Sequence, residues 1–463
     1  MTTLQKLILL THTLVLFFIT KPASASHAAG LEITYKHLVG SNYRLHATFY
    51  RDCFGIPAPV TITIQATAAS CGLNFSYVLD TIPGTGQPIT QVCAGAHTTC
   101  TGGTTPGLEK WEYEVDVLLP AQCADWIFAT TVCCNIGTTI QPASSMVVET
   151  TLNNLNADNN SPQFTNDPLQ YSCLNQDFHY NNGMVDPDGD SIAYRLVDAL
   201  GAIYNPPYSG LHPFSSTPPV SFDSITGDFF MHPIAAESGP VDFEILDYRN
   251  GVLVGSVIRE ILMTIQPCGS HYPTATEMNG TTQQFTYVLP GDTVCFDIFS
   301  DDTDAAEIDS MSWNNSIPAA TFSVAGSPHP TGTFCWTPTL ADVRSQPYMF
   351  TATVQDNYCP ANNVEVYSYY IYVTLDSSLV ILNAKDPGTD FIFSVSSNPS
   401  HGIFTIQSTQ QFSQLKIYDV LGECVLKKVF EKNIDFKAVP DGIYFIEAIT
   451  KSGEHHIQKL VKE

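Results

Sequence analysis

Apolar and polar residues alternate in short runs along most of the chain. These runs are rich in Val, Ile, Thr, Tyr and Phe, and clusters of Gly, Pro, Asn and Asp separate them. Examples are residues 43–50, 60–66, 111–118, 257–265 and 364–375. Alternation with a period of two indicates strands that bury one face, and almost no segment shows a sustained helical period. The pattern predicts an all-β protein made of antiparallel sandwiches.

The N-terminal end has a different pattern. Lys6 precedes an apolar stretch at residues 7–19, and Ala-Ser-Ala follows at residues 23–25. A basic start, a short apolar core and small residues before a cut are typical of a signal peptide, so residues 1–25 are predicted to be removed before Ser26. A membrane anchor is the alternative, but the stretch is shorter than a comfortable span and polar residues interrupt it.

The length of 463 residues fits three or four domains. Two polar segments, residues 153–162 and 382–390, are predicted to be linkers because they lack an apolar period. The prediction is a Cys-rich N-terminal sandwich, two further sandwiches of cadherin-like type and a small C-terminal sandwich, at residues 26–150, 151–270, 271–380 and 385–463.

An internal repeat supports two sandwiches of one type. Each copy has an acidic turn, then a Gly-aromatic strand end before a Pro, then a Pro-led strand with an aromatic residue. The elements lie at residues 185–190, 227–233 and 240–245, and again at residues 300–304, 332–338 and 347–352. Two copies of one unit explain this order. Both resemble the cadherin-like, dystroglycan-type Ig domains of secreted bacterial proteins, although Met231 stands in the first copy where the second has Trp336.

Cysteine usage agrees with export. All 13 Cys follow the predicted cleavage site, and in an oxidising compartment they are expected to form disulfides. Because 13 is odd, at least one Cys has no intramolecular partner. Cys424 is the predicted one, since residues 385–463 contain no other Cys. Most of the others are expected to pair inside their own sandwiches.

The charge excludes one class of partner. Asp and Glu number 45 against 19 Lys and Arg, which gives a net charge of −26. Such an acidic chain repels phosphate backbones, so no nucleic-acid partner is expected. Residues 385–463 are nearly neutral by contrast, with nine Lys and ten acids. After the predicted cleavage site no stretch reaches the ~18 apolar residues of a transmembrane helix.

Short motifs in the first segment carry a second resemblance. Glu-Ile-Thr-Tyr at residues 32–35, Tyr-Arg-Asp-Cys at residues 50–53, and Trp126 before Cys133-Cys134 are similar to the N-terminal region of gliding-motility-associated surface proteins. Residues 160–164 and 248–251 continue the resemblance. It implies a secreted, multidomain surface protein with an adhesive or structural role.

The tail carries the most extensive motif. Its elements are the opening Asn398-Pro399 with Gly402, a strand ending in Tyr418-Asp419 before Gly422, Gly442 with Tyr444, and a closing Lys-Leu-Val-Lys at residues 459–462. The order resembles the type A sorting domain of the type IX secretion system, although Ser397 replaces the usual first Pro. The resemblance implies a small seven-strand sandwich that engages the secretion machinery, is then removed, and often leaves the protein attached to surface lipopolysaccharide. An ordinary terminal Ig domain is the alternative.

One acidic turn is a candidate metal site. Asp186, Asp188 and Asp190 share a Gly-containing turn, and hard cations such as Ca²⁺ bind several oxygen ligands at close range. The distal Glu of an EF-hand loop is absent. The alternative is a tight turn whose carboxylates lie in solvent. Asp301, Asp302 and Asp304 form a weaker candidate of the same kind.

Catalytic motifs are missing. The chain contains no His-Glu-x-x-His and no Gly-x-Ser-x-Gly, and small sandwiches already account for each region. A non-enzymatic secreted or surface protein without catalytic residues is therefore predicted, with a surface glycan or a protein as its ligand. Trp111, Trp126 and Trp313 would form a flat platform in a carbohydrate-binding protein. A spatially assembled Ser-His-Asp triad or carboxylate pair would instead indicate a hydrolase.

Overall fold

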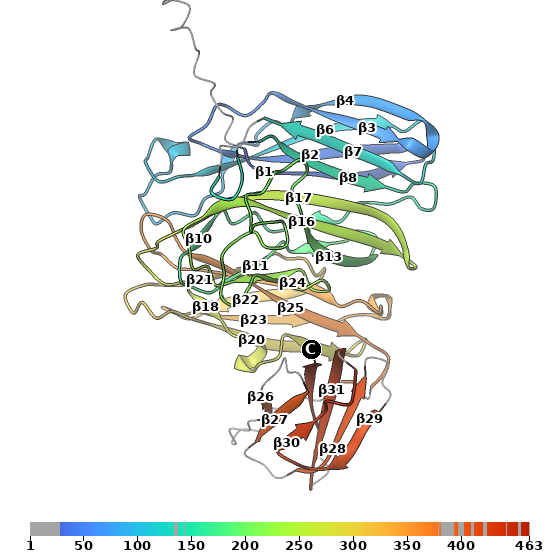
Figure 1. Cartoon of the computed structure of the whole chain (residues 1–463), viewed down its shortest axis with the longest axis vertical. Coiled ribbons are helices and arrows are strands. Elements are labelled where there is room, and N and C mark those ends of the chain that lie inside the picture. Colours follow the sequence, from blue (N-terminus) through green and yellow to red (C-terminus); the bar gives the residue numbers. More distant parts are fainter. Residues whose placement is uncertain are drawn as a thin grey trace, which may run out of the picture. The chain divides into compact units, whose positions relative to one another are not determined.

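The computed structural model describes residues 28–133, 138–142, 144–377, 379–380, 393–396, 402–408, 412–419, 424–440, 442–451 and 455–462. The predicted signal peptide and the predicted linker at residues 382–390 lie outside these residues. The chain divides into two compact units, Met1–Ile381 and Leu382–Glu463 (Figure 1). The described chain is all-β, as predicted, with four one-turn 3₁₀ helices: η1 (Ala69–Cys71), η2 (Thr99–Thr101), η3 (Met278–Gly280) and η4 (Leu340–Asp342). Within this part, no helix is long and apolar enough to cross a membrane.

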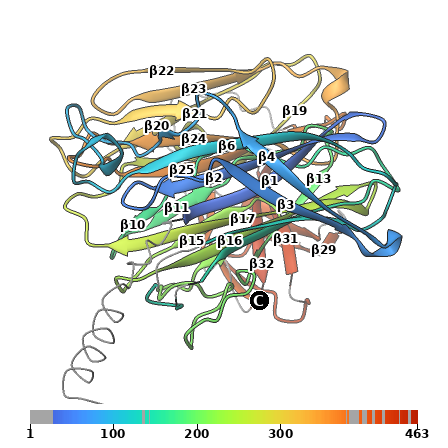
Figure 2. The ribbon, with the colours of Figure 1, turned by 90° about the horizontal axis from the view of Figure 1, so that it is seen from above.

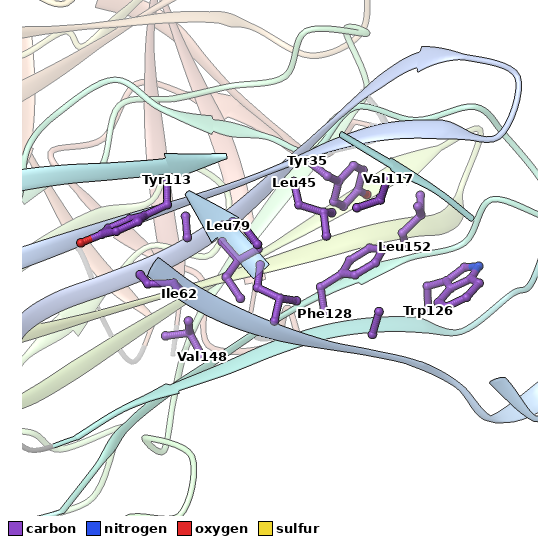
Figure 3. Close-up of a cluster of buried hydrophobic side chains, with 14 of the residues drawn as sticks. Tyr35, Leu45, Ile62, Leu79, Tyr113, Val117, Trp126, Phe128, Val148 and Leu152 are labelled. Atoms are coloured by element: carbon purple, nitrogen blue, oxygen red, sulfur yellow. The ribbon is translucent and has the colours of Figure 1, made fainter. Parts of the chain in front are cut away.

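The first sandwich is built from eight strands. They are β1 (Ala28–Val39), β2 (Asn42–Asp52), β3 (Thr61–Ala68), β4 (Leu73–Thr81), β5 (Gln87–Pro88), β6 (Leu108–Leu118), β7 (Trp126–Val132) and β8 (Met146–Leu152). Seven of them hydrogen-bond in the order β1-β2-β6-β4-β3-β7-β8, and β5 pairs with β6. Alternate residues point inward. Figure 3 shows side chains such as Leu45, Trp126, Phe128 and Leu152 gathered in one cluster, and these four are fully buried.

The second sandwich follows directly. Its strands are β9 (Gln163–Phe164), β10 (Tyr171–Cys173), β11 (Phe178–Asn181), β12 (Met184–Val185), β13 (Ser191–Val197), β14 (Ser221–Phe222), β15 (Asp228–Met231), β16 (Ser238–Arg249) and β17 (Val252–Gln266). One sheet runs β13-β16-β17 with β10 parallel to β17, and a smaller sheet runs β11-β15-β14. Aromatic side chains including Phe178, Phe229 and Phe243 fill the space between them.

Strand β17 belongs to both sandwiches. One of its edges pairs with β16 along most of its length. Its other edge pairs with β8, where Gly255 lies opposite Leu152, and then with β1, where Ile261 lies opposite Gly30. The circuit of strands in the first sandwich therefore closes through a strand of the second. Figure 2 shows β17 between β1 and β16. The predicted boundary between residues 150 and 151 is thus wrong as a division into independent sandwiches, because it falls inside β8.

The predicted linker at residues 153–162 is packed against the fold. Asn159 is fully buried, and its Nδ2 donates hydrogen bonds to the Tyr35 hydroxyl at 3.1 Å and to Asp247 Oδ2 at 2.7 Å. Ser161 is also buried and exchanges hydrogen bonds with the Tyr35 backbone. Asn and Ser serve here as internal hydrogen-bonding groups, so their polarity did not mark a flexible connection.

The third sandwich repeats the second. Its strands are β18 (Thr274–Ala275), β19 (Phe285–Val288), β20 (Val294–Asp301), β21 (Ser310–Trp313), β22 (Thr321–Ala325), β23 (Thr331–Trp336), β24 (Tyr348–Gln355) and β25 (Val364–Val373). The sheets run β19-β25-β24-β21 and β18-β20-β23-β22, with β19 parallel to β25. The first matches β10-β17-β16-β13 strand for strand. In the second, β20-β23-β22 matches β11-β15-β14, and β18 has no counterpart in that smaller sheet. The repeat predicted from the sequence is confirmed as a repeat of topology.

Hydrogen bonds join the second and third sandwiches. The His179 backbone N–H donates to Glu365 Oε2 at 2.9 Å, and the Tyr370 hydroxyl donates to Asp228 Oδ2 at 3.0 Å. Figure 1 shows β16 and β17 between the N-terminal strands and the third sandwich. The three sandwiches therefore form one compact body rather than a row of separate domains.

Five disulfides are described. Four join Cys within one predicted segment, as expected: Cys53–Cys100, Cys71–Cys123, Cys173–Cys268 and Cys295–Cys335. The fifth, Cys93–Cys359, was not predicted and ties a loop of the first sandwich to the third. Cys133 is disulfide-bonded as well. Cys424 is the free cysteine of the described chain, which confirms that prediction.

The C-terminal unit is a separate small sandwich of seven described strands. They are β26 (Phe393–Ser396), β27 (Ile403–Ser408), β28 (Phe412–Asp419), β29 (Cys424–Val429), β30 (Asn433–Asp435), β31 (Gly442–Thr450) and β32 (His455–Lys462). One sheet runs β26-β27-β30 and the other β29-β28-β31-β32. Phe404, Ile417, Phe436, Ile446 and Leu460 are fully buried between them.

Candidate functional site

The acidic turn lies between β12 and β13, and Arg249 at the end of β16 reaches it. Arg249 binds both carboxylate oxygens of Asp190 at 2.6–2.9 Å and Asp188 Oδ2 at 2.7 Å. Asn160 donates two further hydrogen bonds to Asp188. Partial burial opposes the charge of Asp188, but these hydrogen bonds prevail and hold its pKa below the ordinary value. Asp188 is therefore occupied by protein groups and is not part of the carboxylate cluster that the structure forms.

That cluster contains Asp186, Asp190 and Asp247, whose carboxylate oxygens lie within 4.8 Å of one another. Asp247, on β16, is fully buried. Asp186 Oδ2 and Asp247 Oδ1 are buried without a hydrogen-bond partner. Burial raises the pKa of Asp186 to about 6, and burial together with the Asp186 charge raises the pKa of Asp247 to about 8. Two carboxylate oxygens without partners, one on the turn and one on β16, fit a hard cation such as Ca²⁺.

The third sandwich has a cluster at the matching place. Asp302, Glu307 and Asp356 bring carboxylate oxygens within 4.8 Å of one another, and Asp302 Oδ2 and Glu307 Oε2 are buried without a partner. Asp304, which the sequence placed in this turn, instead accepts hydrogen bonds from the Ser270 hydroxyl and the His271 backbone. Asp301 is exposed at the end of β20.

Sequence analysis missed the buried member of each cluster. Asp247 and Asp356 lie about 60 and 50 residues after their turns in the chain, yet each comes close to the end of the Pro-led strand of its repeat. Superposing the two copies of the repeat would have shown an Asp at the end of that strand in each. Sequence neighbours alone favoured Asp188, because nearness along the chain does not show which way a side chain points.

The three Trp do not form a platform. Trp126 is fully buried and stacks on Phe128 in the first core. Trp313 is half-buried against Phe322, Phe334 and Phe350 of the third sandwich. Trp111, also half-buried, covers Gly86 and donates a hydrogen bond to Glu109. The flat aromatic surface considered for carbohydrate binding is therefore absent at these positions.

The predicted sorting residues that the structure describes lie in or beside the C-terminal sandwich. Gly402 precedes β27 with φ of +107°, and a Cβ there would lie 2.9–3.0 Å from backbone atoms of Lys437, so the close approach requires glycine. Gly442 begins β31, and the buried Tyr444 donates a hydrogen bond to the Pro440 carbonyl at 2.8 Å.

The remaining sorting residues divide between strand positions and undescribed ones. On β28, Tyr418 donates to Glu447 Oε2 at 2.9 Å, and Asp419 ends that strand. Lys416 forms an ion pair with the same Glu447 carboxylate at 2.9 Å. Asn398, Pro399 and Gly422 lie outside the described residues. The described sorting residues therefore shape the turns and strand ends of this sandwich.

Comparison with known families identifies the C-terminal unit. Residues 395–463 match the family described as "Secretion system C-terminal sorting domain". The chain therefore ends in a sorting domain that engages the type IX secretion machinery, which makes it a secreted or cell-surface protein. A comparison with curated proteins gave no match.

Several solved structures match this chain at low identity and low TM-score, and some of them consist of Ig domains. A Dpr2 Ig1-Ig2 structure in complex with DIP-Theta is 12% identical, with a TM-score of 0.20, and the match covers 46% of this chain and 99% of that one. The four N-terminal Ig domains of Dscam1 isoform 4.44 are 11% identical, with a TM-score of 0.16, covering 94% and 99%. A Bacteroides ovatus SGBP-B in complex with a mixed-linkage heptasaccharide is 12% identical, with a TM-score of 0.15, covering 66% and 71%. At such TM-scores none of them assigns a ligand to this chain.

Proposed function

We propose that this chain is a non-enzymatic surface or extracellular protein, delivered by the type IX system, whose three-sandwich body is an adhesive or structural element. The sorting domain carries the proposal, because its family match spans residues 395–463. The body supports a mechanical role: it shares β17 between two sandwiches and joins the first to the third through Cys93–Cys359. A body held together by a disulfide and a shared strand can transmit force without a change in its fold.

The gliding-related and cadherin-like readings belong to this proposal. Short motifs in the first segment support the gliding-related role, and the repeated topology of the second and third sandwiches supports the cadherin-like type.

One arrangement in the described chain contains the residue types of a catalytic triad, but its hydrogen bonds differ from those of a triad. Ser270 lies beside the His271–Asp304 pair, but its hydroxyl donates to Asp304 and Glu307. In a catalytic triad, by contrast, the imidazole accepts the serine proton.

A strain of the producing bacterium that lacks the protein is expected to attach to surfaces and to spread by gliding less than the wild type. Loss of an adhesive protein removes the contacts that it makes with the surface. Attachment under flow and colony spreading measure the effect, and expression of the full chain should restore both. If attachment and spreading both match the wild type, the adhesive proposal is wrong.

We further propose that Ca²⁺ stiffens the body at the Asp186–Asp190–Asp247 cluster. Arg249 already offsets the charges of Asp188 and Asp190, which leaves Asp186 and Asp247 facing each other with unpartnered oxygens. A cation there would relieve the cost of burying two like charges. The equivalent cluster around Asp356 would gain in the same way.

Millimolar Ca²⁺ is expected to raise the melting temperature of the purified full chain, and a chelator should reverse the change. Extracellular modules bind Ca²⁺ with dissociation constants of ~10⁻⁴–10⁻³ M. At ten times that constant, binding adds about 1.4 kcal/mol to the free energy of unfolding. Asp247→Asn should remove the part of the response due to this cluster, whereas Asp188→Ala, the matched control on the same turn, should keep it. Identical melting with calcium and with chelator would show that the cluster holds no ion.

A further inference from the structure

A cleft lies where all three sandwiches meet, and we name it the junction cleft. Its volume is about 500 Å³, within the ~300–1,000 Å³ range of ligand-binding pockets. The first sandwich supplies Thr90, the second Gln170, Tyr171 and Tyr272, and the third Tyr358 and Asn362. Neither the acidic clusters nor the C-terminal unit contributes to it.

The lining of the junction cleft is uncharged. None of the described residues that line it is Asp, Glu, Lys, Arg or His, although the whole chain carries a net charge of −26. Amide and hydroxyl groups alternate there with tyrosine rings and prolines. A neutral lining in so acidic a protein offers no counter-charge to a metal ion, a phosphate or a sulfated ligand.

Two hydrogen-bond acceptors in the cleft have no partner in the protein. Gln170 is 8% exposed, and its Oε1 is buried without a donor. Asn362 Oδ1 is buried without a donor as well. Buried acceptors are nearly always satisfied. A turn of either terminal amide would bring its oxygen to the cleft surface, where a ligand hydroxyl can donate to it. The amide nitrogens of the same side chains add donors of their own.

The cleft walls are fixed before any ligand arrives. Cys173–Cys268 lies in the lining itself, and Cys93–Cys359 joins the loop of the first sandwich to the third beside it. The Asn362 backbone N–H donates to the Gln91 carbonyl at 3.3 Å across the same junction. Walls braced in this way lose little conformational entropy on binding, which favours affinity.

We propose that the junction cleft binds a neutral oligosaccharide. Sugar hydroxyls bring several uncharged donors to Gln170 Oε1 and Asn362 Oδ1, and the apolar faces of sugar rings pack on tyrosine rings. A peptide fits less well, because the bordering strand β10 spans only Tyr171–Cys173 and gives little backbone for strand addition. This inference goes beyond the adhesive role and does not depend on it.

The test uses the purified full chain and a panel of neutral glucan, mannan, galactan and xylan hexasaccharides, with binding measured by calorimetry. Uronate and sulfated oligosaccharides and a random peptide mixture are the competing probes. At least one neutral hexasaccharide is expected to bind. Gln170→Leu and Asn362→Leu should each weaken it by about tenfold or more, because each removes a buried hydrogen-bond acceptor.

Gln122→Leu, an exposed Gln outside the cleft, is the matched control and should bind like the wild type. Melting curves identify any variant that has lost its fold. If Gln170→Leu is unfolded, Asn362→Leu and the half-buried Tyr358→Ala decide the question. The proposal is overturned if no neutral probe binds, if only a charged probe or a peptide binds, or if folded cleft variants bind with wild-type affinity.

Discussion

Deletion of residues 385–463 is expected to abolish surface delivery and to leave the three-sandwich body in the periplasm. The tail is a complete sandwich in a compact unit of its own, so its removal takes away the sorting signal without opening the core of the body. Cell fractionation and antibody labelling of intact cells measure the effect. Surface signal should fall to background while the periplasmic fraction gains the truncated chain.

A point variant separates the signal from the length of the chain. Gly402→Val would place side-chain atoms against the Lys437 backbone at a positive φ, so the tail should misfold and delivery should fail as in the deletion. Lys437→Ala, which removes an exposed side chain at the same contact, should be delivered normally. Normal display of the truncated chain would contradict the assigned role of the tail.

Arg259→Met is expected to destabilise the body by about 3–5 kcal/mol. Arg259 lies in the middle of β17, is 1% exposed, and pairs with the buried carboxylate of Glu32 on β1. Its guanidinium also donates to the Asn166 carbonyl at 2.8 Å and lies 3.8 Å from the centre of the Phe164 ring. Removing the cation leaves Glu32 buried without a counter-charge. Denaturant unfolding of the purified chain measures the loss.

The double variant Glu32→Gln with Arg259→Met should recover much of that loss, because neither member of this pair then leaves the other as an unpaired buried charge. Arg44→Met is the matched control. Arg44 forms an exposed ion pair with Asp116 on the same sandwich, so its loss should change stability little. Equal stability of Arg259→Met and the wild type would show that the buried pair does not hold the two sandwiches together.

Local patterns in the sequence predicted the elements better than their partners. Alternation gave strands such as β2 and β6 nearly as they are, and the repeat gave the matching topology of the second and third sandwiches. The role of β17 was missed, because no local pattern states which strands pair. One signal was present: Arg259-Glu260 interrupts an otherwise apolar run, and charges in such a strand indicate burial with partners.

The candidate sites show the same limit. The turn at residues 185–190 was placed correctly as acidic, but its partner Asp247 comes from another strand, and Asp188 turns toward Arg249. The junction cleft is assembled from loops of three sandwiches, so no single segment carries its signature. Cys424 was predicted because it depends only on counting, whereas Cys93–Cys359 depends on how distant loops meet.

The position of β17 in the chain sets the order in which the body can fold. Strand β1 (residues 28–39) is synthesised long before β17. Because the partner of Gly30 on β17 is Ile261, this edge of β1 stays uncovered until more than half of the body has been synthesised. Until then both β1 and β8 expose unpaired backbone, the kind of edge that recruits other chains into aggregates. Such long-range pairing slows folding, since loop closure is paid for before the contacts form. The first two sandwiches should therefore fold together, late and cooperatively, and a nascent chain shorter than about 266 residues should depend on chaperones to stay soluble.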